Sequence, residues 1–397
     1  MIKDRINVLE VFTFCFLFIC IFFPGDPYNL KIVFFFMLCI FGIRAFIIQI
    51  KRCNCIDVLF MGSIYPIILM LWSVLLTGNI SMAISGAYPA VLILLVIIVK
   101  EYKINYEKNM MFLLQLLAIA TIAIVFLDII GISSVNGSNA LRNFFYQYDM
   151  GLMGKSVAYA AYYKVFFKAS PLLLIFLPYC FEKGKTGMAF VALIALYLSG
   201  TRANIFIATV IFLFGIINIW SENKKNYRIR MFIGVVIIAM AIFSVPIIIS
   251  VIVDMMSASG AVSSDAVRMG QMRSFVNVFK DPVKLFFGMG FGSEFYDEGR
   301  MVYAAASEMS YFDLLRKIGI LWFIPFICFI VKPFMCKIGI HLKVAYLGYL
   351  IGAATNPLLF SSTAYVLYIY LYTLEKKQIC NTGKEKQRNI LLETENF

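Results

Sequence analysis

A chain of 397 residues in which hydrophobic residues make up 62% and charged residues 14% has too little polar surface to cover a globule in water. Its mean hydropathy of +0.87 excludes an ordinary soluble domain. The formal net charge of +13 is dispersed over short loops, which argues against nucleic-acid binding. We therefore expect an integral membrane protein.

Apolar runs long enough to cross a bilayer, which takes roughly 17–25 residues, recur along almost the whole chain. They predict an all-α polytopic protein of about twelve transmembrane helices. The predicted spans lie at 6–23, 32–50, 56–76, 80–99, 109–130, 165–181, 187–200, 203–220, 231–253, 318–331, 338–355 and 357–374. Pro357 disfavours helical backbone at Asn356 and so separates the last two spans. The runs do not alternate apolar and polar residues, which excludes a membrane barrel.

Lysine and arginine fall in every second loop between these spans, from Lys3 and Arg5 to the basic tail. This positive-inside pattern predicts cytoplasmic termini, and it favours contact with anionic membrane lipid. The first run lacks a small-residue cleavage site, so no cleaved signal peptide is expected.

Two polar segments on the opposite side are longer than simple connectors. Because they mix aromatic residues with glycine, we expect both to fold as lids outside the cytoplasm. The predicted organisation is a first membrane bundle at 1–130, a medium outer loop at 131–164, a second bundle at 165–253, a large outer loop at 254–317, C-terminal helices at 318–374 and a cytoplasmic basic tail at 375–397.

The cysteines and the histidine do not predict a metal site. Five of the nine cysteines lie within predicted spans, and Cys53 and Cys55 fall in a predicted cytoplasmic loop, where thiols stay reduced. The sequence contains one histidine, His341, which reads as an interfacial residue. We therefore expect neither a metal nor a cofactor.

The first candidate functional element is the tight outer turn from Leu198 to Asn204. Arg202 lies here at the membrane boundary, on the side that normally avoids cations. A guanidinium at this position can hold a phosphate with paired N–H donors. It can equally extend to lipid headgroups, and the pattern leaves both open.

The large outer loop contains a predicted helix over 266–280. An apolar stripe at helical spacing supports it, formed by Met269, Met272, Val276 and Phe279. Ser264 or Asp265 can cap its start. Arg268 and Arg273 lie roughly 140° apart around this helix, so one face does not present both. Both arginines are either ligand contacts or solvated side chains of a lid.

Three glycines at alternate positions follow, Gly288, Gly290 and Gly292. Glycine permits positive φ and close backbone approach, and exposed N–H groups in such a turn can cradle an anion. The βαβ context of a nucleotide-binding loop is missing.

The loop ends in a predicted helix that enters the tenth span, with Ser307 as its possible cap and Tyr311 in its first turns. Glu308 lies near the start of this helix. A carboxylate there can act as a general base towards a hydroxyl, or it can simply interact with the helix dipole.

The order and sidedness of these motifs resemble the superfamily of O-antigen ligases and Wzy-type O-antigen or capsule polymerases. The resemblance rests on Ser199-Gly200-Thr201-Arg202, the arginine-bearing helix, Gly-x-Gly-x-Gly, Glu-x-Ser-Tyr at 308–311, Leu-Leu-Arg-Lys-Ile-Gly-Ile at 314–320 and Asn356-Pro357. It covers about 195–360, whereas the first half matches only as hydrophobic spans.

This resemblance implies a GT-C-like fold and a metal-independent glycosyltransferase in the bacterial cytoplasmic membrane. A polymerase of this kind transfers a growing undecaprenyl-diphosphate-linked glycan to the non-reducing end of an incoming lipid-linked repeat unit at the outer face. It implies that Arg202 and Arg268, with Arg273 less closely matched, stabilise the diphosphate leaving group. Glu308 stands where ligases of the superfamily place a histidine, which implies a base or an acceptor binder.

Three rival functions remain open. An O-antigen ligase shares the fold and the donor, although the sequence has no outer histidine. A lipid-linked oligosaccharide flippase would place charges inside its spans, where this chain has few, such as Arg44 and Asp128. A solute transporter would usually show two related halves. A chain-length regulator is a further possible partner of a polymerase.

The medium loop is rich in tyrosine and in cations. The tyrosines are Tyr146, Tyr148, Tyr159, Tyr162 and Tyr163, and the cations are Arg142, Lys155 and Lys164. The rings suit sugar stacking as well as an interfacial aromatic belt, and the sequence does not separate the two.

Overall fold

The computed structural model describes residues 2–26, 28–51, 55–130, 134–135, 138–155, 163–222 and 264–374. Within these residues the protein is mostly helical, with three small antiparallel sheets of two strands each. Apolar side chains of large size are exposed along the helices, including Leu75 at 79% and Phe206 at 72%. An apolar exterior of this kind fits a lipid environment.

The helices are α1 (Ile2–Phe22), α2 (Leu30–Phe41), α3 (Ile43–Lys51), α4 (Ile56–Leu59), α5 (Tyr65–Thr77), α6 (Ile80–Val91), α7 (Leu95–Tyr102), α8 (Tyr106–Ile129), α9 (Ala140–Gln147), α10 (Leu173–Glu182), α11 (Thr186–Leu198), α12 (Arg202–Glu222), α14 (Ser264–Phe279), α15 (Pro282–Phe287), α16 (Ser310–Met335), α17 (Ile340–Ala353) and a last helix over 362–374. Short π and 3₁₀ turns lie at Phe60–Ile64, Leu92–Leu94 and Ser170–Leu172. The strands are β1 (Ser134–Val135), β2 (Ser138–Asn139), β3 (Gly151–Lys155), β4 (Tyr163–Phe167), β5 (Phe295–Asp297) and β6 (Val302–Ala304).

Four helical stretches in the described part are long and apolar enough to cross a membrane. They are Ile56–Thr77, Ile80–Tyr102, Tyr106–Asp128 and Ser310–Met335. A fifth candidate is the pair Leu30–Phe41 and Ile43–Ile50, which is bent by 61°. Five more apolar helices have only 10–17 residues. The protein therefore has the helical character of a membrane protein, while the twelve-span count stays a prediction and its ninth span, 231–253, lies outside the described residues.

The predicted sixth span begins too early. Val165 to Phe167 belong to strand β4, which pairs with β3, and the apolar helix starts only at Ser170. A short run of β-branched and aromatic residues suits a strand as well as a buried helix, so its period does not separate them.

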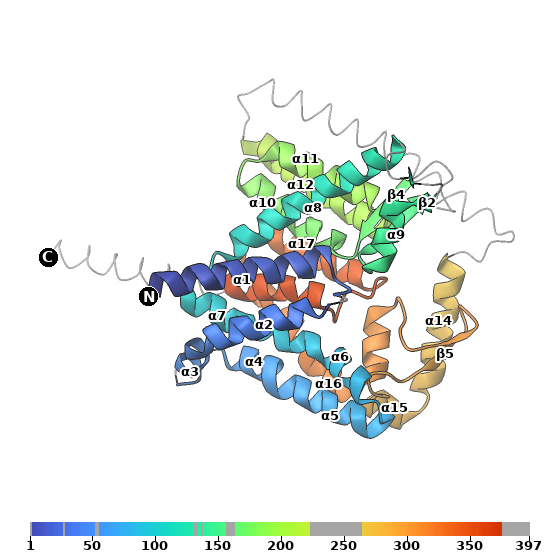
Figure 1. Ribbon diagram of the computed structural model, residues 1–397. Helices are drawn as coiled ribbons and strands as arrows, with labels where there is room; N and C mark the ends of the chain where they lie inside the picture. Colours follow the sequence, from blue (N-terminus) through green and yellow to red (C-terminus); the bar gives the residue numbers. More distant parts are fainter. Residues whose placement is uncertain are drawn as a thin grey trace.

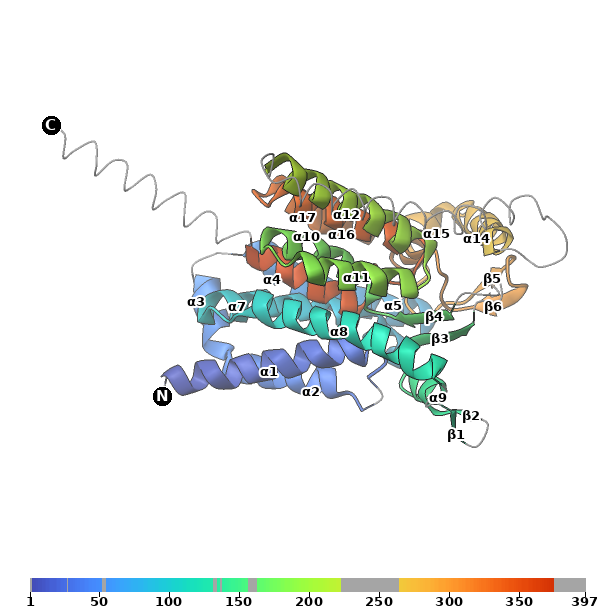
Figure 2. The same ribbon diagram turned by 90° about the horizontal axis from the view of Figure 1, so that it is seen from above.

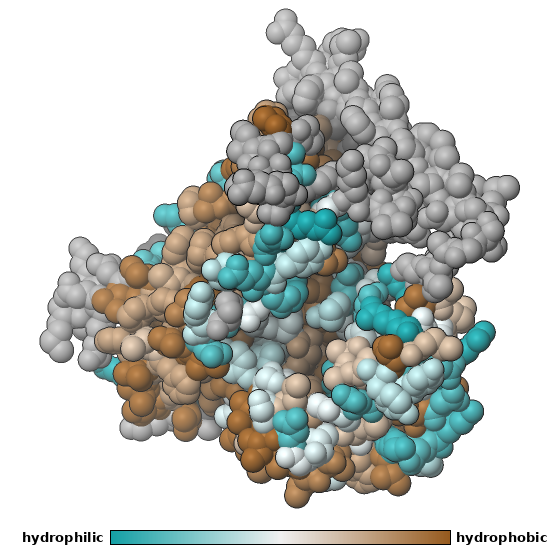
Figure 3. All heavy atoms as spheres, turned by 45° about the vertical axis from the view of Figure 1, so that its right-hand side comes forward, coloured by the Kyte–Doolittle hydropathy of each residue, from teal (hydrophilic) through white to brown (hydrophobic). Residues whose placement is uncertain are grey.

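The helices run side by side, and the segments that hold α9, the β3–β4 hairpin, α14 and β5–β6 gather at one end of the bundle (Figures 1 and 2). The N-terminus lies at the opposite end. Figure 3 shows hydrophobic residues over much of the bundle and hydrophilic residues around a hollow at this gathered end. We call it the loop end.

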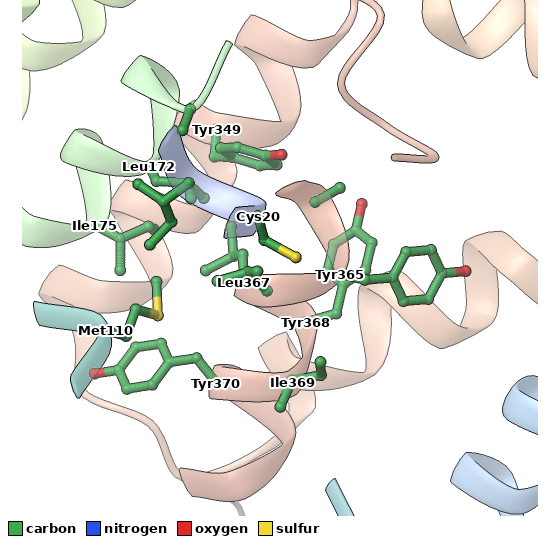
Figure 4. Close-up of a cluster of buried hydrophobic side chains, with 14 of the residues drawn as sticks. Cys20, Met110, Leu172, Ile175, Tyr349, Tyr365, Leu367, Tyr368, Ile369 and Tyr370 are labelled. Carbon is green, nitrogen blue, oxygen red and sulfur yellow. The ribbon is translucent and has the colours of Figure 1, made fainter. Parts of the chain in front are cut away.

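Tyrosines fill much of the core beneath it. Side chains from α1, α8, α10, α17 and the last helix point toward one another there (Figure 4). Each buried hydroxyl needs an acceptor, and several donate to backbone carbonyls: Tyr106 to Val366 O at 2.9 Å and Tyr368 to Leu359 O at 2.9 Å.

Candidate functional site

Residues 264–309 form a folded unit at the loop end. Helix α14 packs on the β5–β6 hairpin so closely that an added Cβ on Gly270 would lie 2.4 Å from the Cα of Gly299. The buried Gln271 donates from Nε2 to Asp297 Oδ2 at 2.8 Å. Phe275 stacks on Phe295, with ring centroids 5.1 Å apart.

The predicted apolar stripe of this helix is wrong. Helix α14 matches the expected range, but Met269 and Val276 are exposed at 60% and 52%. The buried face instead carries Gln271, Ser274 and Phe275. This mixed face is buried because the carboxylate and amide groups of the β5–β6 hairpin find hydrogen-bond partners on it.

The glycine segment docks on a break in α16 and does not form an open anion cradle. Gly319 adopts φ 70 and ψ 168 inside α16, a conformation almost restricted to glycine. The carbonyls of this turn accept two amides of the segment: Met289 N–H donates to Arg316 O and Gly290 N–H to Lys317 O, both at 2.8 Å. Phe291 N–H donates to Ser73 Oγ at 3.0 Å. Three amides expected to face a ligand are therefore occupied by the protein.

The glycines themselves are needed for this docking. Gly288, Gly290 and Gly292 all have positive φ, at 77, 81 and 87. A Cβ on Gly288 would lie 2.5 Å from Lys317 O, so no side chain fits. The segment thereby fixes the large loop to the membrane helices α5 and α16.

A fully buried arginine strengthens this junction. The Arg316 guanidinium donates to Asp313 Oδ1 at 2.9 Å, to Ser293 Oγ at 2.8 Å and to Ala305 O at 3.1 Å. It also lies 4.5 Å from the centroid of the Phe295 ring. The sequence alone assigns no role to Arg316. Its spacing of three residues from Asp313 on a predicted helix is the signal that indicates an ion pair.

Glu308 lies among cations at the loop end. Arg300, at the β5–β6 turn, forms an ion pair with Glu308 at 2.5 Å, and both side chains are about two-fifths exposed, at 44% and 41%. Burial lowers the pKa of the Lys164 ammonium, and the Glu308 carboxylate acts in the opposite direction and raises it. Lys164 belongs to β4, so the charge of Glu308 acts on a group of the medium-loop hairpin as well as on Arg300 of the large loop. Arg300 was missed from the sequence, because its contact depends on the hairpin fold.

A second cluster joins the first turn of α12 to the end of α17. Asn204 is fully buried, and its Oδ1 would lie 3.1 Å from a Cβ on Gly352. Asn356 Nδ2 donates to Gly352 O at 2.9 Å, and Ser310 Oγ donates to Asn356 O. Ser310 begins α16 two residues after Glu308. The structure therefore brings the outer turn at 198–204, the Asn356 turn and the start of α16 together.

The remaining predicted residues fall in different places. Arg202 opens α12, but its side chain lies outside the described part, as do Tyr159, Tyr162 and the side chains of Lys155 and Tyr163. Arg268 is half-buried on α14, and Arg273 is exposed. Tyr311 turns towards α17, where its hydroxyl donates to Leu350 O at 3.0 Å. Ser307 does not cap α16, which has Met309 at its N-cap position.

Comparisons with known proteins add no assignment. No protein-family model matches this chain, and a search of curated proteins finds no match. Among the described residues, no group of three histidine, cysteine, aspartate or glutamate side chains is placed to hold a metal ion. The functional argument therefore rests on the residues at the loop end.

Proposed function

We propose that this protein is an oligosaccharide repeat-unit polymerase of the bacterial cytoplasmic membrane. It transfers a growing undecaprenyl-diphosphate-linked glycan to the non-reducing end of an incoming lipid-linked repeat unit at the outer face. The observation that carries the proposal is the position of Glu308, between Arg300 of the large loop and Lys164 of the hairpin. One carboxylate at the end of a helical bundle is thus paired with a cation of the large loop and acts electrostatically on a cation of the hairpin.

The proposed reaction requires a group that receives one proton and cations that stabilise the departing diphosphate. The acceptor hydroxyl attacks the anomeric carbon of the donor, the bond from that carbon to the diphosphate oxygen breaks, and the hydroxyl proton passes to Glu308. Negative charge develops on the departing diphosphate. Arg268, half-buried on α14, and Arg202, at the start of α12, are proposed to stabilise that charge.

Deleting the gene and profiling the surface glycan tests the class of reaction. A ladder that collapses to a single attached repeat unit supports a polymerase. Absence of any attached unit, with carrier-linked polymer accumulating, would instead identify a ligase. An unchanged ladder would reject both and favour transport.

Variants at Arg268 test its role. Arg268→Ala should slow chain extension by about 100-fold or more, the effect of removing a preorganised donor to developing charge. Arg268→Lys should recover only part of the rate, because an ammonium does not reproduce the guanidinium fork. Lys280→Ala, at an exposed position just after the same helix, is the control. Normal polymer length in Arg268→Ala, at equal protein level, would reject the assignment.

A further inference from the structure

An apolar groove opens at the loop-end side of α1 and α2, away from Glu308. It has a volume of about 460 Å³, and its accessible lining is apolar. Six aromatic residues line it, together with Cys15, Ile19, Leu30 and Asp26: Phe14, Phe18, Phe23, Tyr28, Phe34 and Tyr148. None of the residues assigned to the proposed reaction lines this groove.

The size and lining of the groove select its occupant. A volume of this order holds one small ligand or a single chain, since ligand pockets measure roughly 300–1,000 Å³. It is too small for a partner helix about 10 Å across. An apolar, aromatic surface between two membrane helices suits a hydrocarbon chain entering from the bilayer. The groove therefore fits one lipid chain.

The rim of the groove is polar on the side of the hairpin. Lys168 and Asp149 form an ion pair next to Tyr148, which lines the groove. The turn that holds Asp26 packs on them, because a Cβ on Gly25 would lie 2.6 Å from Asp149 Cβ. A lipid whose chain fills the groove would place its polar end at Lys168.

From that rim, the outer face of the hairpin leads to Glu308. Val165 and Phe167 of β4 are fully buried, so the alternation of a strand places Lys164 and Phe166 on the other face, and Lys168 follows directly after the strand. These three side chains are half-buried, and the Lys164 ammonium lies 5.4 Å from the Phe166 ring centroid. Four residues of strand span ~13 Å, which separates Lys168 from Lys164.

Lys168, Phe166 and Lys164 together have the chemistry to bind an oligosaccharide. Lysine donates hydrogen bonds to sugar hydroxyls or acids, and an aromatic ring stacks on a sugar face. At its far end, Lys164 lies within the electrostatic reach of Glu308, which the proposed reaction uses to receive the acceptor hydroxyl proton. The path therefore joins a lipid groove to an acceptor hydroxyl site.

We propose that the groove between α1 and α2 holds a segment of the polyprenyl chain of the acceptor substrate, and that its repeat unit lies along Lys168, Phe166 and Lys164 to present its terminal hydroxyl to Glu308. This inference rests on the proposed polymerase function. It assigns the acceptor carrier to the first bundle and leaves the donor diphosphate to Arg202 and Arg268. The two lipid-linked substrates thus enter from different sides.

Native mass spectrometry of the full-length protein in detergent tests the groove, with geranylgeranyl diphosphate as the probe. Cys15→Trp and Leu30→Trp should fill the groove and weaken retention of one bound equivalent about tenfold or more, the change expected when a few methylene groups lose apolar contact. Cys15→Ala should keep it. Leu76→Trp is the matched control, because Leu76 is exposed at 46% and Leu30 at 40%, and Leu76 does not line the groove.

Two results would overturn the proposal. One is equal retention of the probe by the wild type and both tryptophan variants. The other is displacement of the probe from the groove by phosphatidylethanolamine at equal concentration, which would identify a bulk-lipid contact. Leu30→Trp guards against misfolding of Cys15→Trp, because residue 30 is partly exposed. Loss of the probe in these variants, combined with an unchanged glycan ladder in the deletion strain, would leave the groove valid and reject the polymerase function.

Discussion

Asn204 has a buried side-chain amide whose hydrogen-bonding groups the fold leaves unused. Its side chain is fully buried, and neither its Oδ1 nor its Nδ2 has a hydrogen-bond partner among the residues that the structure describes. The nearby Thr201 hydroxyl is also buried without one. A buried polar group left without a partner costs about 1–3 kcal/mol of stability. Retaining such a group two residues after Arg202 is typical of functional sites, where stability is sacrificed.

We expect Asn204→Leu to raise the free energy of unfolding by up to about 1–3 kcal/mol, because the apolar side chain removes the unsatisfied amide at similar volume. The measurement is thermal unfolding in detergent, combined with chain extension. Higher stability with lost extension would show that Asn204 serves the reaction. Lower stability would mean that the amide has a structural partner after all.

The electrostatic effect of Glu308 on Lys164 gives a second residue-scale prediction. The Glu308 carboxylate raises the pKa of Lys164, so Glu308→Gln should lower that pKa further. The neutral amine is the reactive form, and acylation of Lys164 should therefore begin at lower pH in the variant. Peptide mass spectrometry across pH measures this, with Lys280 as an internal control. The fold should persist, because an exposed ion pair such as Arg300–Glu308 contributes only about 0–1 kcal/mol. An unchanged pH dependence of Lys164 acylation would show that the charge of Glu308 does not act on Lys164.

At the scale of elements, the junction between the glycine segment and α16 holds the large loop in place. The loop reaches α16 through backbone hydrogen bonds and through the buried Arg316, which pairs with Asp313 on the same helix and donates to Ser293 Oγ and Ala305 O of the loop. Removing one partner of a buried pair costs roughly 3–5 kcal/mol, because the other charge stays in a dry site. A rigid junction explains how residues 281–309 can hold Glu308 at a fixed place on the helical bundle.

Gly319→Ala tests this junction. A Cβ at residue 319 would lie 2.4 Å from Gly288 N, at a φ of 70 that alanine rarely adopts. We expect loss of the docked state, with a destabilisation of at least about 1–3 kcal/mol from the backbone conformation alone. Limited proteolysis should then cleave within 281–309. Gly187→Ala is the control, because an added Cβ there meets nothing within 4 Å. Equal protease resistance in both variants would contradict the role of this junction.

At the scale of the whole molecule, the bundle places both outer segments at one end. Helix α16 has 26 residues with a break at Gly319, and it is long and apolar enough for its two ends to lie on opposite sides of a bilayer. Met301 lies before its start and is exposed at 71%, whereas Met335 ends it and is exposed at 84%. The two positions are a natural pair for a test of orientation.

In a variant without native cysteines, Met301→Cys should react with a membrane-impermeant thiol reagent applied to intact spheroplasts. Met335→Cys should react only after lysis, because the positive-inside pattern assigns that end to the cytoplasm. Labelling in the reverse order would invert the predicted topology and remove the outer-face reaction.

The sequence alone determined the helical, membrane-type character, because apolar length is a local property. It also located α14 and the turn at Arg202, although the apolar stripe that predicted α14 is not the buried face of that helix. Tertiary structure decided which face of α14 is buried, because carboxylate and amide groups of the β5–β6 hairpin form hydrogen bonds with that face. It likewise decided that amides of the glycine segment bind α16, and that the charge of Glu308 acts on Lys164. These contacts join segments far apart in sequence, and no local pattern encodes them.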